Sequence, residues 1–299
     1  MRTMPRSMGD RLRHRAELWL RSERALGLSS VRHVRRNPAA SLGMNAARST
    51  ASPASPRVTM PAAPKRTAPI AAAAPPLVIA RTASANALFQ APLTAPVLNT
   101  AEKILQLQAM NTSEVSICTK CVLCKTRKQT VFGEGDPDAK IFFIGEGPGE
   151  TEDQTGRPFV GKAGQLLDKM IAAMGLRRDQ VFIANIVKCR PPGNRVPEPA
   201  EVESCTPYLE RQLEIVRPQA IVTLGLPAAR YMLQSAASMG SMRGRFHSWR
   251  GIQLMPTYHP AYVLRSYTKQ TREAVWSDLQ QVMALVKLPG AARKSKETT

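Results

Sequence analysis

The sequence predicts a three-layer α/β/α fold in which a central, mostly parallel four-stranded sheet lies between helices. Two observations predict it. Short apolar runs alternate with segments of helical periodicity, and strands separated by helices of about 10 to 15 residues indicate βαβ units with a parallel sheet. Both patterns are confined to about residues 101–288. We therefore expect one domain there, preceded by a different kind of chain.

Four apolar runs are expected to form the strands, at residues 141–144, 181–184, 220–225 and 252–257. Polar or glycine-rich residues follow three of them. The first run leads into Gly145-Glu146-Gly147-Pro148-Gly149, the second ends at Asn185, and the last precedes His259-Pro260. Because the carboxyl ends of parallel strands meet at one edge of a sheet, these segments are expected to form one site.

Helices are expected between the strands. Residues 101–110 are expected to form a short helix, and Pro227 suits the first turn of another. Apolar residues at helical spacing predict three further helices, marked by Leu166, Leu167, Met170, Ile171 and Met174, by Val202, Cys205, Leu209 and Leu213, and by Val275, Leu279, Val282 and Val286.

Residues 1–100 form a basic extension rich in Ala, Pro and Arg, with 15 basic and 3 acidic residues. Leu12, Trp19 and Leu26 have a spacing compatible with one amphipathic helix over residues 11–26. The rest of the extension is expected to be mostly disordered, because it cannot bury enough apolar surface to offset its ordering entropy. A short basic tail is expected at residues 289–299.

The net charge of the chain is +20, from 42 Lys and Arg against 22 Asp and Glu. This charge favours a polyanionic partner, usually nucleic acid. The sequence contains no run of about 18 apolar residues, so no membrane span is expected, and it begins without the apolar stretch of a secretory signal. We expect a bacterial cytoplasmic protein. The alternative is an organellar one, if the Arg-rich start is a transit peptide.

Four cysteines have the spacing of metal ligands. Cys118 and Cys121 are separated by two residues, which lets both thiolates reach one centre, and Cys189 and Cys205 follow later in the chain. A disulfide framework is not expected in so large a chain, so metal-bound thiolates in a reducing compartment are favoured. The residues alone leave structural zinc open, since zinc accepts the same four thiolates. Cys124 is an extra thiol.

Taken together, these motifs resemble the iron–sulfur uracil-DNA glycosylases of the family-4 type, from about Cys118 to about Val286. The segment from Gly145 through Gly161 carries much of this resemblance. It implies an enzyme that flips uracil out of DNA, hydrolyses its N-glycosidic bond and leaves an abasic site for base excision repair. It also implies a structural 4Fe-4S cluster held by Cys118, Cys121, Cys189 and Cys205, with zinc as the alternative.

The resemblance also implies roles in the base pocket. Phe159 stacks on the base, while the Asn185 amide accepts from uracil N3–H and donates to O4. His259 contacts O2, where negative charge collects, and backbone N–H groups near Gly147 assist it. Other glycosylase families carry a water-aiming side chain where Gly147 stands, so Glu146 or Glu152 is a candidate substitute.

The implied partner is uracil-containing DNA, single- or double-stranded, bound by a monomer. Arg190, Arg195 and Arg265 are candidate phosphate contacts, and Val263 or Leu264 is a candidate wedge that replaces the flipped nucleotide. Two alternatives remain open. One is a covalent uracil-DNA-binding relative, although the interval from Cys189 to Cys205 is too short for the Arg/His-rich insertion of that family. The other is a non-catalytic DNA-binding module.

Overall fold

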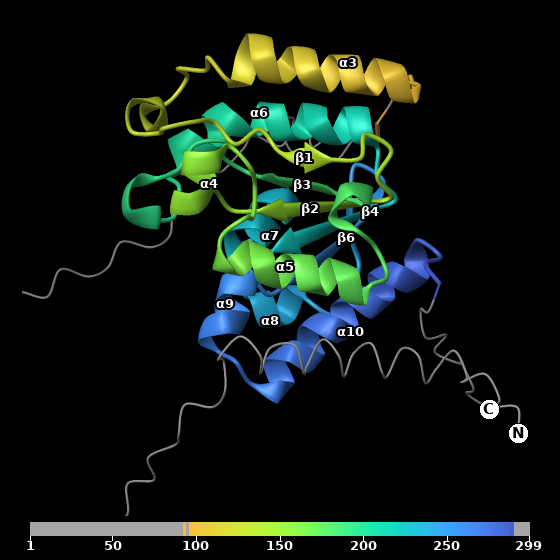
Figure 1. Ribbon diagram of the computed structural model, residues 1–299. Coiled ribbons are helices and arrows are strands. Elements are labelled where there is room, and N and C mark those ends of the chain that lie inside the picture. Colours follow the sequence, from red (N-terminus) through yellow and green to blue (C-terminus); the bar gives the residue numbers. More distant parts are fainter. Residues whose placement is uncertain (1–91, 94–95, 290–299) are drawn as a thin grey trace, which may run out of the picture.

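The computed structural model describes residues 92–93 and 96–289 (Figure 1). The predicted helix at residues 11–26, the expected disorder of the extension and the tail after residue 289 lie outside the described residues. Among the residues described, the helices are all too short or too polar to cross a membrane.

The described residues form one six-stranded sheet in the order β1-β3-β2-β4-β6-β5. The strands are β1 (Glu134–Gly135), β2 (Ile141–Gly145), β3 (Phe182–Asn185), β4 (Ala220–Leu224), β5 (His247–Trp249) and β6 (Ile252–Thr257). The four central strands are parallel, as predicted, and β1 and β5 pair antiparallel at the two edges.

The predicted count of four strands is therefore wrong, although the α/β class is confirmed. The two missed strands are short edge strands of two and three residues. Each pairs with only one neighbour, so neither needs the continuous apolar run that marks a strand buried on both faces. β2, β3 and β4 are fully buried along their length, which is why the sequence reveals them.

Helices cover both faces of the sheet (Figure 1). One face carries α3 (Thr100–Met110), α6 (Pro199–Val216) and α7 (Leu226–Leu233). The other carries α5 (Lys162–Ala173), α9 (Pro260–Arg265) and α10 (Lys269–Leu285). The remaining helical segments are η2 (Asn111–Val115), η3 (Val122–Lys125), α4 (Glu150–Thr155), η4 (Arg178–Gln180), η5 (Pro192–Asn194) and α8 (Met239–Met242).

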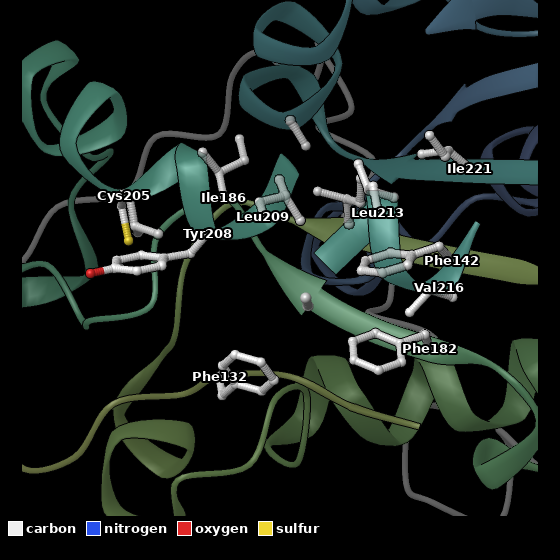
Figure 2. Close-up of a cluster of buried hydrophobic side chains, with 14 of the residues drawn as sticks. Phe132, Phe142, Phe182, Ile186, Cys205, Tyr208, Leu209, Leu213, Val216 and Ile221 are labelled. Carbon is white, nitrogen blue, oxygen red and sulfur yellow. The ribbon is translucent and has the colours of Figure 1, made fainter. Parts of the chain in front are cut away.

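The hydrophobic core between the sheet and α6 extends as far as Cys205. Phe142 and Phe182 of adjacent strands stack with ring centroids 4.8 Å apart, and the apolar stripe of α6 packs over them. Figure 2 shows Cys205 and Tyr208 at one end of this cluster. The helix that closes the core therefore also carries one of the predicted metal ligands.

Candidate functional site

A cleft of about 740 Å³ lies at the carboxyl ends of the parallel strands. It is lined by residues from the turns after β2 and β3, the segment before α5, the end of β4 and the segment after β6. The structure brings together all six residues that were predicted for the base pocket: Glu146, Gly147, Glu152, Phe159, Asn185 and His259.

Asn185 is the last residue of β3 and is paired in register with Gly145 of β2. Its side chain is only 1% exposed, and its Oδ1 atom has no hydrogen-bond partner among the described residues. A Cβ atom at Gly145 would overlap Asn185 Oδ1 and the ring of Phe159. Glycine at position 145 thus lets the amide and the aromatic ring approach each other over the strand ends.

Phe159 has a left-handed backbone with φ 49°, which is costly for a bulky residue unless its surroundings fix it. Its ring is 6% exposed, packs into the core below α5, and also lines the cleft. The ring centroid lies 5.6 Å from that of His259. Phe159 is therefore part of the hydrophobic core and part of the cleft lining.

Two charged side chains hold the loop that carries Phe159. The Glu152 carboxylate accepts hydrogen bonds from the N–H groups of Gly149, Val160 and Gly161 at 3.1, 2.9 and 2.8 Å. Arg178 donates to the carbonyl oxygen of Phe159 at 3.2 Å. Because three backbone amides occupy the Glu152 carboxylate, this geometry favours loop organisation over water activation for Glu152. The role of Arg178 could not be predicted from the sequence.

Glu146 is the half-buried carboxylate of the turn after β2. Burial raises its pKa above the ordinary value of a glutamate, because a carboxylate removed from water favours its neutral form. A carboxylate of this kind in a cleft is suited to accept a proton or to face a developing positive charge.

His259 is the N-cap residue of α9, and its Nδ1 accepts a hydrogen bond from the N–H of Ala261 at 3.0 Å. In the neutral ring the proton therefore lies on Nε2, which is left as a donor. Burial, assisted by the charge of Arg265, lowers the pKa of His259 to about 4. At neutral pH the cleft thus contains an uncharged imidazole N–H donor.

Arg195 and Arg265 line the cleft, whereas Arg190 is not among its lining residues. Arg190 bonds Asn194 at 2.8 Å and approaches Glu150 at 3.8 Å, and Arg195 pairs with Glu201 at 2.6 Å. Both arginines of this loop are therefore already oriented by neighbours of their own.

The structure contradicts Val263 as a wedge. Its side chain is 1% exposed and packs in the core, and Leu264 also packs against that core. The exposed residue of this turn is Tyr262, which is 40% exposed, lines the cleft and stacks on Tyr258 at 5.0 Å between ring centroids. Helical periodicity after Pro260 could have revealed this, since residues 260 and 263 share the inner face.

The four predicted ligand cysteines line one small cavity. They come from three segments: Cys118 and Cys121 from the loop before η3, Cys189 from the loop after β3, and Cys205 from α6. Cys124 lies within η3 and is not among the lining residues. The topology thus separates the extra thiol from the other four.

The cavity suits an anionic metal–thiolate centre. Burial raises the pKa of Cys205 to about 12 and also raises the pKa values of Cys121 and Cys189, so these thiolates need a compensating positive charge. Positive side chains line the cavity, namely Lys120, Arg127 and Lys188. Within the described residues, no group of three or more His, Cys, Asp or Glu side chains is arranged to hold a single metal ion.

Two hydrogen bonds already point at the sulfur atoms. Arg127 Nη1 donates to Cys189 Sγ at 3.2 Å, and the N–H of Lys188 donates to Cys205 Sγ at 3.2 Å. Donors of this type stabilise thiolates that are bound to iron. The donor set and its surroundings therefore fit a thiolate-bound metal group.

Comparison with known proteins gives consistent matches. Residues 132–280 match the model of the uracil DNA glycosylase superfamily. A type-4 uracil-DNA glycosylase of Sulfurisphaera tokodaii is 46% identical over 185 residues, which is 59% of this chain and 83% of that protein. One of Thermotoga maritima is 42% identical over 187 residues, 62% of this chain and 97% of that protein. One of Saccharolobus solfataricus is 47% identical over 178 residues, 56% of this chain and 82% of that protein.

Proposed function

The chain belongs to the uracil DNA glycosylase superfamily and, within it, to the type-4 enzymes, and from this premise we propose that it excises uracil from DNA to start base excision repair. It hydrolyses the N-glycosidic bond of a nucleotide flipped out of the helix and leaves an abasic site. The observation that carries this proposal is the unpartnered Oδ1 of the buried Asn185, which lines the cleft beside the Phe159 ring.

The pocket has the functional groups that uracil requires. Phe159 offers an aromatic face for a flipped base. The Asn185 amide accepts from N3–H and donates to O4, a pair of contacts that cytosine cannot satisfy because its N3 lacks a proton and its position 4 carries an amine. The bound base supplies the partner that Oδ1 lacks, which offsets the cost of burying this amide.

Cleavage moves one electron pair. The bond between C1′ and N1 breaks, and the pair stays on uracil, whose negative charge collects at O2 while the sugar becomes a cation. His259 Nε2–H donates to O2 as that negative charge develops. Because the imidazole is neutral, the buried site provides a hydrogen-bond donor without having to bury a positive charge. Water then adds to C1′ and gives its proton to a base.

Glu146 is the group we assign to the sugar side of this reaction. Its carboxylate lines the cleft. The Glu152 carboxylate, by contrast, is occupied by hydrogen bonds from backbone N–H groups. When ionised it stabilises the sugar cation and accepts the proton of the attacking water. Glu152 acts indirectly, by holding the loop on which Phe159 is mounted.

The function is tested by incubating the iron-loaded full chain with a labelled oligonucleotide that contains one deoxyuridine. Free uracil and an alkali-labile abasic site are the expected products. A complex that survives denaturation would instead indicate a covalent uracil-DNA-binding protein, and binding without release would indicate a non-catalytic module. Either of those results would overturn the proposal.

The excision rate is expected to fall on the acid side because of Glu146. Its pKa is raised by burial, so as pH decreases it becomes protonated at a higher pH than an ordinary glutamate, and the ionised form is lost. His259 does not contribute to this decline until its own pKa of about 4.

Single-turnover rates of the wild type and Glu146→Gln between about pH 5 and 8 measure the effect. The variant should be slower and lose this acid decline. An unchanged acid decline in Glu146→Gln would exclude Glu146 as the titrating group.

Tyr262 is expected to contact DNA in the role first assigned to Val263 or Leu264. Tyr262→Ala removes an exposed stacking face worth about 1–3 kcal/mol per base, so excision from duplex DNA should fall about tenfold while the melting temperature stays near that of the wild type. Val263→Ala is the matched control on the same helix. It should lower the melting temperature through loss of core packing and leave excision by the folded enzyme nearly unchanged. The reverse pattern would restore Val263 as the wedge.

The cofactor we assign to the cysteine cavity is a 4Fe-4S cluster, with structural zinc as the alternative. Cys118, Cys121, Cys189 and Cys205 would hold it, and when bound it supplies a covalent cross-link between three segments rather than redox chemistry. The support is the number of thiols, the two donors aimed at sulfur and the positive side chains around them. Iron–sulfur clusters are typically held by four cysteine thiolates in this way.

A further inference from the structure

One buried lysine connects the cysteine cavity to the base pocket. Lys188 follows β3, and its side chain is 1% exposed, which is rare for lysine because burying an ammonium is costly. Such a side chain persists when its contacts compensate for that cost. Lys188 is neither one of the predicted metal ligands nor one of the residues that line the cleft.

The contacts of Lys188 extend in two directions. Its ammonium reaches back three residues to donate to the main-chain carbonyl of Asn185 at 3.0 Å, and it also donates to Gln212 Oε1 at 2.6 Å. Gln212 belongs to α6 and donates in turn to the carbonyl of Phe132 at 2.9 Å. The end of β3 is thus fixed to α6 and to the segment before β1.

The other direction leads to the cysteines. The N–H of Lys188 donates to Cys205 Sγ at 3.2 Å, and Lys188 lines the cysteine cavity. The side chain itself is held by two neutral oxygens, those of Asn185 and Gln212. One residue therefore touches the centre and fixes the backbone of Asn185.

We propose that Lys188 is a positioning residue through which the cysteine centre controls base recognition. By fixing the Asn185 carbonyl, it sets the depth at which the Asn185 amide enters the cleft, and the hydrogen bond from its N–H to Cys205 ties the same residue to the centre. This inference rests on the proposed function. It assigns the metal group a purpose beyond stability, namely the discrimination of uracil from cytosine.

The test compares two lysine-to-methionine variants of the full, iron-loaded chain. Lys188→Met keeps the length and apolar stem of the side chain but removes the donors. Lys103→Met is the matched control, since Lys103 is also buried and donates to a main-chain carbonyl, that of Val216 at 3.1 Å. The probes are oligonucleotides with 2′-fluorinated deoxyuridine or deoxycytidine, in which the fluorine blocks excision, so that equilibrium affinity is read without turnover.

In Lys188→Met we expect the ratio of uracil to cytosine affinity to fall about 10- to 100-fold, as does a site whose polar groups are displaced by about an ångström. Lys103→Met should lose thermal stability and keep the wild-type ratio. In an Asn185→Ala background, Lys188→Met should lower the ratio no further, because both changes act through one amide. If Lys188→Met does not fold, Gln212→Leu, which removes the other partner of the ammonium, should shift the ratio in the same direction.

A wild-type ratio in folded Lys188→Met, or in Gln212→Leu where it replaces it, would overturn the proposal. The proposal would also be overturned if Lys188→Met lowered the uracil-to-cytosine affinity ratio by its full factor in the Asn185→Ala background, since Lys188 would then act through another group. These outcomes are distinct from failure of the proposed function. In that case the wild type itself would release no uracil and would not prefer the uracil probe.

Discussion

Uracil excision by Asn185→Asp is expected to fall by about 10³-fold or more, with weak release of cytosine in its place. An ionised Asp cannot donate to uracil O4, and its charge repels that oxygen. It can still accept a hydrogen bond from the amine of cytosine. Sites built on hydrogen bonds lose discrimination steeply when a donor is lost, by factors of about 10⁴–10⁵ in strong cases. Single-turnover excision from uracil and cytosine oligonucleotides measures both effects.

The control for this experiment is a second Asn→Asp change in the same cleft. Asn194 lines the cleft on the loop after β3, where its side chain accepts from Arg190 at 2.8 Å. Asn194→Asp adds the same negative charge near the DNA without touching the base-recognising amide, so it should lower affinity slightly and leave the preference for uracil unchanged. If Asn185→Asp and Asn194→Asp behaved alike, repulsion of the phosphate backbone would explain the loss, and Asn185 would be a structural strand-end residue.

The central part of the fold could be predicted because burial leaves a continuous signal. β2, β3 and β4 are apolar along their whole length, and helices such as α5 show one apolar stripe. β1 and β5 could not be predicted in this way, because two or three residues at a sheet edge carry no period. The motifs identified the fold, whereas the edge strands β1 and β5 were found only in the structure.

Much of the base pocket could be predicted for a related reason. Gly145 and Asn185 end adjacent parallel strands, so their meeting follows from topology. Contacts that link distant side chains left no such trace. The three amides bound by Glu152 favour loop organisation over the water activation considered for it. The ammonium of Lys188 had no sequence signal, since a lysine beside a cysteine motif is usually a solvated charge.

Val263 illustrates a limit of motif transfer. Val263 and Leu264 follow His259 by four and five residues and were the two candidates for a wedge. The short helix α9 turns Val263 into the core, packs Leu264 against that core and exposes Tyr262 instead. A motif fixes the order of residues along the chain. Helical rotation decides which of them reaches the ligand, and that rotation depends on how Pro260 and Val263 pack in the core.

The loss of iron from Cys189→Ser is the second large effect expected. Purified without oxygen, the wild type should contain about four irons per chain, the complement of one 4Fe-4S cluster. Cys189 is buried, receives a hydrogen bond from Arg127 and lines the cavity with the other three cysteines. A serine hydroxyl is a much poorer ligand for iron than a thiolate. The variant should therefore lose most of its iron and part of its solubility.

Cys124→Ser provides the comparison, because Cys124 lies in η3 outside the lining of the cavity. It should keep wild-type iron content, melting temperature and uracil release. Metal loss should also impair base recognition, since the cavity and Asn185 share Lys188. Any Cys189→Ser protein that stays folded should therefore discriminate uracil from cytosine less well than Cys124→Ser. Stoichiometric zinc without iron in anaerobic wild-type protein would contradict the cluster assignment. Equal iron loss in both variants would instead make Cys124 a ligand and require a different arrangement of the four thiolates.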